Sequence, residues 1–126
     1  MLKILSYINI TLAIGYFLLY LLNSLSYAIL GILAVVVYNA LVIHIIDRQI
    51  RFNTLHITIG STNFGFAGFL ILWAINLTIS SFTYQYFGNT LLYISLSIPL
   101  ATGIFIHFIL SLIKYIKDKK DKLREN

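Results

Sequence analysis

Two histidines are the residues in this sequence best suited to cofactor chemistry. His44 and His107 fall near the same end of two long apolar segments that should run parallel. Two facing imidazoles could hold a b-type haem between helices. Their expected depths differ by about 5 Å, at a rise of about 1.5 Å per residue. The alternative interpretation is that each imidazole hydrogen-bonds a neighbouring helix or a lipid headgroup, and that the protein holds no cofactor.

Uncharged polar and small residues recur on one face of several apolar segments. At 100° per residue, Asn9, Tyr16 and Tyr20 share a face, as do Gly65, Gly68 and Asn76. Small residues let helix backbones approach each other, while amides and hydroxyls hydrogen-bond between helices. We therefore predict seams of helix packing, with a polar lining of a water-filled path as the alternative. The residues assigned to these seams or to this lining are Asn9, Tyr16, Tyr20, Tyr38, Gly65, Gly68, Asn76 and Thr78.

Charged side chains are missing from all the apolar segments. Proton-coupled transporters depend on a carboxylate within the membrane, so an antiporter acting alone is not expected. No nucleophile, base and acid are spaced as a catalytic set, and no two carboxylates are paired. The sequence contains no cysteine, which excludes thiol chemistry and Cys-based metal sites. We therefore expect neither an enzyme nor a metal centre.

The elements that carry these residues follow from composition and length. Of 126 residues, 60% are hydrophobic and 10% are charged, whereas a soluble domain has roughly 25% charged residues. A chain this small could not bury so much apolar surface in water. A helix that spans a membrane needs about 20 apolar residues, and lipid requires the backbone to be paired within each span. Four segments qualify: residues 4–22, 27–46, 61–81 and 90–113.

The predicted fold is all-α: four transmembrane helices in an antiparallel bundle, forming one membrane domain over residues 1–126. The first segment is longer than the apolar core of a usual signal peptide, so we expect it to be retained as a span. Asn63 or Ser61 is the expected N-cap of the third helix. Pro99 should kink the fourth helix, and the basic tail 114–126 should extend that helix into water.

The charged residues predict the topology. All nine Lys and Arg and all four Asp and Glu lie at Lys3, in the loop 47–60 or in the tail. Four spans place these three regions on one side, which the positive-inside rule assigns to the cytoplasm. Both termini are then cytoplasmic, and the tail faces anionic lipid headgroups. We expect no nucleic-acid partner, because no soluble face interleaves basic and aromatic residues. The bias towards Ile, Leu, Tyr, Asn and Lys suggests a prokaryotic cell membrane.

The sequence favours a structural function. With no soluble domain, no charge in the spans and several seams, the chain is expected to be an accessory or assembly subunit of a larger membrane complex. Its partners would be other membrane subunits or copies of itself. The main alternative is a small homo-oligomeric channel or pore with a polar uncharged lining. Further alternatives are a membrane anchor associated with haem or quinone, and a coat protein of a virus or filament.

Overall fold

The protein consists of four α-helices joined by short connections. The computed structural model describes residues 1–23 and 27–126, and the side chains of residues 1–19 and 28–126. All four helices are long and apolar enough to cross a membrane, so the all-helical prediction is confirmed. The helices are α1 (Leu2–Asn23), α2 (Tyr27–Asp47), α3 (Thr54–Tyr84) and α4 (Thr90–Glu125).

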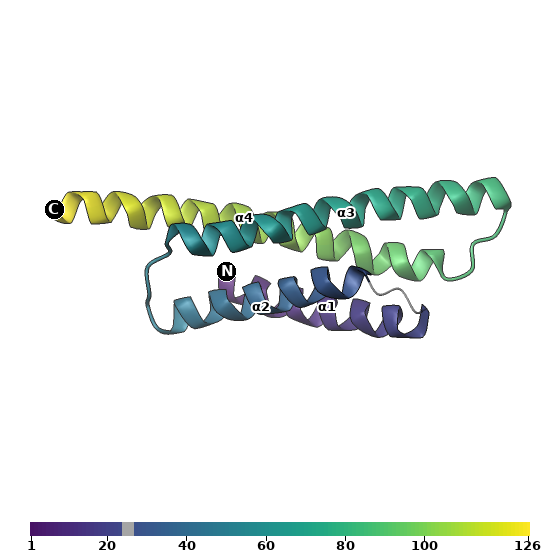
Figure 1. Ribbon diagram of the computed structural model, residues 1–126, viewed down its shortest axis with the longest axis horizontal. Coiled ribbons are helices and arrows are strands. Elements are labelled where there is room, and N and C mark those ends of the chain that lie inside the picture. Colours follow the sequence, from purple (N-terminus) through teal and green to yellow (C-terminus); the bar gives the residue numbers. More distant parts are fainter. Residues whose placement is uncertain (24–26) are drawn as a thin grey trace.

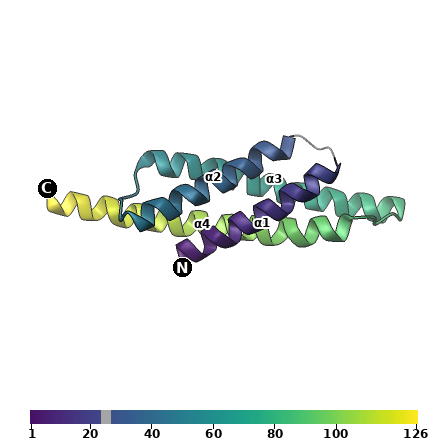
Figure 2. The same ribbon diagram turned by 90° about the horizontal axis from the view of Figure 1, so that it is seen from below.

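The helices form two antiparallel hairpins that lie side by side (Figures 1 and 2). Helices that follow one another in the chain pack together, and α1 closes the ring against α4. Each helix contributes a fully buried side chain to the main core: Tyr16, Val35, Leu70 and Leu100 all have 0% exposure. The four helices therefore share one apolar interior.

Helix α3 begins earlier than residue 61, because a capping box fixes its start at Asn53. The Asn53 side chain accepts a hydrogen bond from the backbone N–H of His56 at 3.1 Å. The backbone N–H of Asn53 donates in turn to Nδ1 of His56 at 3.1 Å, so histidine takes the place of the usual Glu or Gln. The predicted cap at Asn63 or Ser61 is wrong, since both residues lie inside the helix.

Helix α4 continues through Pro99 and includes nearly all of the tail, as predicted for residues 114–126. Proline removes one backbone hydrogen bond, but the helix is unbroken on both sides of Pro99. The hydroxyl of Ser95, one turn earlier, donates to the Leu92 carbonyl at 2.9 Å. The kink at Pro99 stays a prediction.

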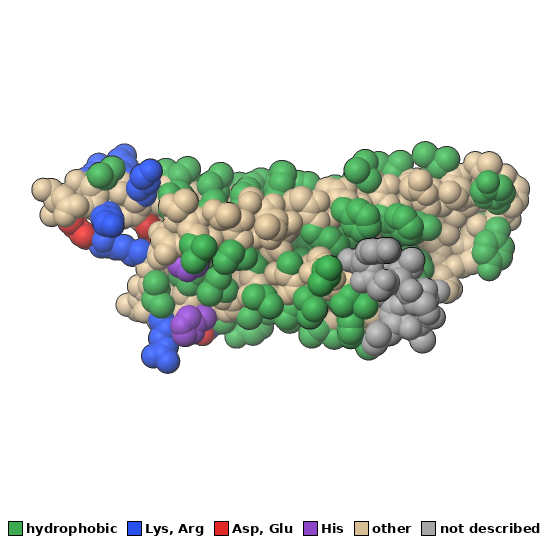
Figure 3. Space-filling model, in the orientation of Figure 1, with side chains coloured by type: hydrophobic (Ala, Val, Ile, Leu, Met, Phe, Trp, Pro, Cys, Tyr) green, Lys and Arg blue, Asp and Glu red, His purple; other side chains and the backbone are tan. Residues whose placement is uncertain are grey.

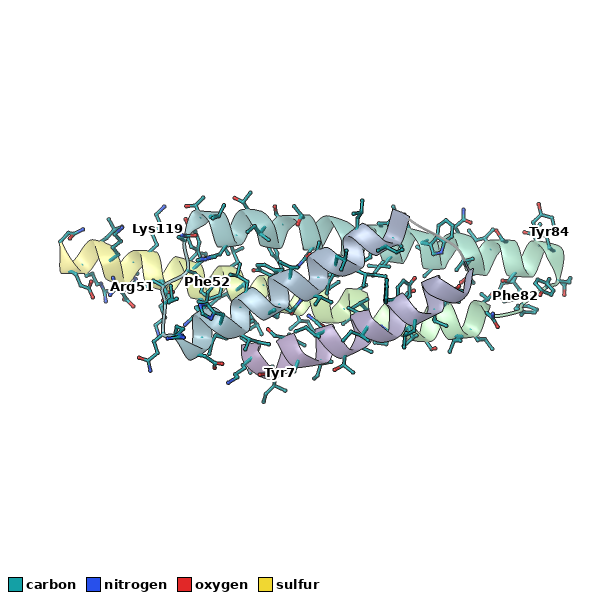
Figure 4. All side chains as sticks on the ribbon, turned by 60° about the horizontal axis from the view of Figure 1, so that its bottom comes forward. Tyr7, Arg51, Phe52, Phe82, Tyr84 and Lys119 are labelled. Carbon is teal, nitrogen blue, oxygen red and sulfur yellow. The ribbon has the colours of Figure 1, made fainter. Side chains whose placement is uncertain are left out.

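The two hairpins differ in length. With 31 and 36 residues, α3 and α4 are about 46 and 54 Å long, whereas α1 and α2 are about 32 Å long. The α3–α4 hairpin extends beyond the α1–α2 hairpin at the end that holds Phe82 and Tyr84 (Figures 1 and 4). Both of these aromatic side chains are exposed.

The charged side chains gather at the opposite end of the bundle (Figure 3). There, the Lys3 ammonium lies 2.6 Å from the Asp47 carboxylate, and the Arg51 guanidinium lies 2.7 Å from the Glu125 carboxylate. These two ion pairs join the start of the chain, the α2–α3 connection and the tail. The three charged regions therefore lie at one end of the bundle, and their placement on one side of a membrane stays a prediction.

Candidate functional site

A layer of buried polar side chains crosses the bundle in the half nearer the charged end. Every helix contributes at least one member, and none of the members is more than 2% exposed. We call these residues the polar layer: Ser6, Asn9, Tyr38, Asn39, Asn63, His107 and Ser111. Such a set is costly to keep in an apolar interior, because buried polar groups lose their hydration.

The strongest contact in the polar layer joins α1 to α4. The Ser6 hydroxyl donates to the Leu2 carbonyl at 3.0 Å, and its oxygen lies 2.7 Å from Nε2 of His107. Either the Ser6 hydroxyl or the Nε2–H of His107 can donate in this second bond, depending on the tautomer of the imidazole. The edge of the Tyr38 ring packs on the His107 imidazole, with centroids 5.6 Å apart.

Two asparagines join α1 to α2 within the polar layer. The Asn9 amide donates to the side-chain oxygen of Asn39 at 3.3 Å, and the Asn39 amide donates to the Val35 carbonyl at 2.8 Å. On its other side, Asn9 lies against Gly103 of α4, where a Cβ would overlap Oδ1 of Asn9. The absence of a side chain at residue 103 therefore makes room for the amide.

Several buried atoms of the polar layer have no hydrogen-bond partner among the described residues. A buried polar group left unpaired costs about 1–3 kcal/mol. Packing alone does not explain so many unpaired polar atoms. The polar layer is therefore the part of the interior best suited to interact with water or a polar species. The atoms without a standard hydrogen bond are Oδ1 of Asn9, both amide atoms of Asn63, and the hydroxyls of Tyr38 and Ser111, which interact with each other outside standard hydrogen-bond geometry.

Sequence reasoning found Asn9, Tyr38 and His107 but missed the other members. Helical spacing held the signal, because Ser6 lies three residues before Asn9, and Ser111 lies four residues after His107. Asn39 is adjacent to Tyr38 but was not assigned to a seam or a polar lining. Asn63 was assigned to a cap and is instead 2% exposed inside α3.

A second polar contact lies farther from the charged end. The Ser97 hydroxyl donates to Oη of Tyr16 at 2.7 Å, and the Tyr93 ring packs edge-on against Tyr16 with centroids 6.3 Å apart. Tyr16 therefore packs between α1 and α4, as a seam residue would. The side chain of Tyr20, predicted for the same seam, lies outside the described residues.

The two histidines of the haem hypothesis occupy different environments. His107 is 1% exposed and its Nε2 is bonded to Ser6, whereas His44 is exposed on α2. Haem ligation would require His107 to exchange Ser6 for iron. The haem hypothesis stays a prediction, and a Soret band in the absorbance spectrum of the purified protein would test it. Among the described residues, no group of three or more His, Asp or Glu side chains could hold a metal ion.

The stripe predicted on α3 faces outward. A Cβ added to Gly65 or Gly68 would meet no atom within 4 Å, and Leu72 between Gly68 and Asn76 is 70% exposed. The Asn76 side chain is exposed and has no hydrogen-bond partner in the described part of the chain. No described residue packs on this face, which we call the α3 outer face and define as Gly65, Gly68, Leu72 and Asn76.

Thr78 lies beside the α3 outer face, in an apolar groove between α3 and α4. Its hydroxyl donates to the Ala74 carbonyl at 2.8 Å, so the threonine is satisfied within its own helix. The groove has a volume of about 220 Å³, and Ile94 and Ile98 of α4 form its far wall. This part of α3 therefore presents an almost wholly apolar surface next to the Asn76 amide.

Comparisons with known proteins add no relative: no family model, curated protein or solved structure matches this chain. Four apolar helices of this length are compatible with a small membrane protein. The contacts described above are the evidence for any narrower role.

Proposed function

We propose that this protein is a multi-pass protein of a prokaryotic cell membrane that serves as an accessory or assembly subunit of a larger membrane complex. The observation that carries the proposal is the α3 outer face. It combines two glycines in open space with the unpaired amide of Asn76 in the second half of an apolar helix. Such a face suits a partner helix better than it suits lipid.

The orientation in the membrane rests on the charged end. Lys3, Arg51 and the lysines of the tail lie at the end joined by the two ion pairs. Cytoplasmic regions carry the excess of Lys and Arg in membrane proteins, so this end is assigned to the cytoplasm together with both termini. The aromatic side chains Phe82 and Tyr84 then lie where an outer aromatic belt forms.

A partner helix would stabilise the α3 outer face in two ways. Glycines allow a second helix backbone to approach closely, and an amide in hydrocarbon gains from a hydrogen bond to another helix. Each such bond is worth about 0.6–2 kcal/mol. Lipid tails offer Asn76 no hydrogen bond, whereas a partner helix can supply a donor or an acceptor. The partner is another membrane subunit or a second copy of this chain.

A double substitution tests the proposal. Protein extracted from its native membrane in mild detergent should migrate as an assembly larger than the monomer. Gly65→Leu with Gly68→Leu should lower the assembled fraction roughly tenfold, because overpacking costs about 1–3 kcal/mol. Gly15→Leu on α1 is the matched control, since a Cβ there also meets nothing within 4 Å. A wild-type protein that is purely monomeric would refute the proposal.

The pore hypothesis remains the second candidate, and the unpaired atoms of the polar layer favour it. A water-filled path could satisfy Asn9, Tyr38 and Asn63, which lie in the interior. The other half of the interior is apolar, with Ile32, Leu70 and Leu100 buried, so conduction would require that half to open. Ion flux into liposomes containing the protein, reduced by Asn9→Leu, would favour a pore over a structural subunit.

A further inference from the structure

A groove separates the α2–α3 connection from the tail of α4 at the charged end. Its volume is about 490 Å³, which falls within the usual range for a small-molecule site. Arg51 and Phe52 form the side contributed by the connection, and Tyr115, Lys119 and Lys122 recur along the facing side of α4. Figure 4 shows Arg51, Phe52 and Lys119 at this end of the molecule.

Specific contacts hold the two sides of the groove together. The backbone N–H of Phe52 donates to the Asp118 carboxylate at 3.0 Å, and the Thr54 hydroxyl lies 3.2 Å from the Tyr115 hydroxyl. Phe52 itself is only 4% exposed, which anchors the connection in the bundle. The groove is therefore part of the fold and does not depend on a chance position of the tail.

The charges that line the groove are mainly positive. Lys119, Lys122 and Arg51 line it together with one acid, Asp118, whose Oδ2 is already bonded to Phe52. Arg51 is bridged to Glu125, but a guanidinium has five N–H donors and keeps some of them free. Within residues 1–23 and 27–126, neither Lys119 nor Lys122 has an ion-pair partner. The ammonium groups of Lys119 and Lys122 can therefore bind an anion in the groove.

The depth of the groove matches the headgroup layer of a bilayer. Lys119 lies six residues beyond residue 113, or about 9 Å along the helix. A headgroup layer adds about 5–8 Å to each side of the hydrocarbon core, and lysine side chains reach back towards such a surface. Tyr115, one turn nearer the core, supplies an apolar contact on the membrane side of the cations.

We propose that this groove binds the phosphate group of an anionic membrane phospholipid. Lys119 and Lys122 contact the phosphate oxygens, Arg51 donates from the other side, and Tyr115 lies against the glycerol and the start of the acyl chains. A soluble phosphate ester offers the same oxygens but would leave the apolar contacts unused. The site shares the membrane placement of the proposed function but does not depend on a partner subunit.

The test measures bound lipid on the full-length, delipidated protein by native mass spectrometry. Phosphatidylglycerol and phosphatidylcholine are titrated separately into the same detergent. We expect phosphatidylglycerol to bind preferentially. Lys119→Gln with Lys122→Gln should weaken this binding about 25-fold, which is roughly fivefold for each cation near an anionic lipid.

The matched control is Lys117→Gln with Lys120→Gln, which removes the same charge from exposed tail residues that do not line the groove. It should leave phosphatidylglycerol binding within about threefold of wild type, since screening weakens more distant charges. Equal losses in the two double variants would overturn the proposal in favour of diffuse attraction to the tail, as would equal binding of the two lipids. Displacement of the lipid by millimolar glycerol 3-phosphate would also overturn it, by assigning the site to a soluble ester.

The outcomes separate this site from the proposed function. If phosphatidylglycerol binding fails while the assembly persists, only the lipid site is refuted. If the assembly is absent while lipid binding shows the expected difference between the two double variants, the lipid site stands without the partner.

Discussion

Ser6 and His107 are 101 residues apart in the sequence, yet their side chains lie 2.7 Å apart in the interior of the bundle. This contact links the first turns of α1 to α4 within the polar layer. It also identifies the half of the protein in which substitutions should have the largest effects on stability.

Ser6→Ala removes the hydroxyl and leaves Nε2 of His107 buried without a partner. We expect a loss of about 1–3 kcal/mol in the free energy of unfolding, measured in mixed detergent micelles. His107→Leu with Ser6→Ala should cost less than the sum of the two single variants, because the double variant leaves neither partner of this bond unpaired. An unchanged stability for Ser6→Ala would contradict the hydrogen bond, and Thr11→Ala, which alters an exposed hydroxyl on α1, is the control.

Gly103→Ala should destabilise the bundle, because the added Cβ would overlap Oδ1 of Asn9. Overpacking of this kind typically costs about 1–3 kcal/mol. Adding Asn9→Ala to this variant should recover part of the loss by removing the overlapping atom. Gly15→Ala is the matched control, since a Cβ there meets nothing within 4 Å, and thermal unfolding of the wild type and the three variants provides the measurement.

The orientation can be tested by labelling, since the chain has no native cysteine. Asn89→Cys in the α3–α4 connection should react with a membrane-impermeant maleimide in intact cells. Lys120→Cys in the tail should react only after the membrane is permeabilised. Labelling of both single-cysteine variants in intact cells, or of the tail alone, would refute the assignment of the charged end to the cytoplasm.

Acid should loosen the tail from the α2–α3 connection. The Arg51 guanidinium lowers the pKa of the Glu125 carboxyl below its ordinary value of 4.5. A lowered pKa means that the ion pair contributes fully above the ordinary value and is lost as the pH falls through the lowered one. Spin labels placed at Ile50→Cys and Asn126→Cys report the distance between the connection and the tail. The distribution of this distance should therefore broaden below about pH 4.5.

Glu125→Gln supplies the control for this pH effect. It should broaden the distance distribution at neutral pH, leaving only the contribution of Asp118, which holds the backbone of Phe52. A wild-type distribution that does not change between pH 7 and pH 3 would show that the Arg51–Glu125 pair does not position the tail.

The number of helices was predictable because apolar length and backbone pairing in lipid leave few alternatives. The gathering of the charged residues at one end followed from the same threading, and the ion pairs of Lys3 with Asp47 and Arg51 with Glu125 fit it. The start of α3 was not predictable from apolar length alone. Its first turn is polar, and the cap depends on a histidine acting as the acceptor.

The partners within the polar layer could not be derived from spacing. Helical periodicity places Asn9 and Tyr16 on one face of α1, but the rotation of each helix about its axis is set by packing against the other helices. Whether Asn9 meets Asn39 or lipid therefore depends on contacts such as Gly31 against Phe66, which only the assembled bundle contains. The same reasoning explains why the stripe on α3 turned outward instead of packing inside the chain.

The unequal hairpins impose a condition on the surrounding lipid. In the proposed membrane placement, a bilayer would match about 32 Å of helix on the side of α1 and α2 and a taller surface on the side of α3 and α4. Hydrophobic mismatch is relieved by tilt, by local thickening or thinning of the bilayer, or by association with other helices. Because the taller hairpin also carries the α3 outer face, a neighbour bound there would relieve elastic stress in the membrane as well as pair Asn76. Bilayer thickness should then shift the equilibrium between the free and the assembled protein.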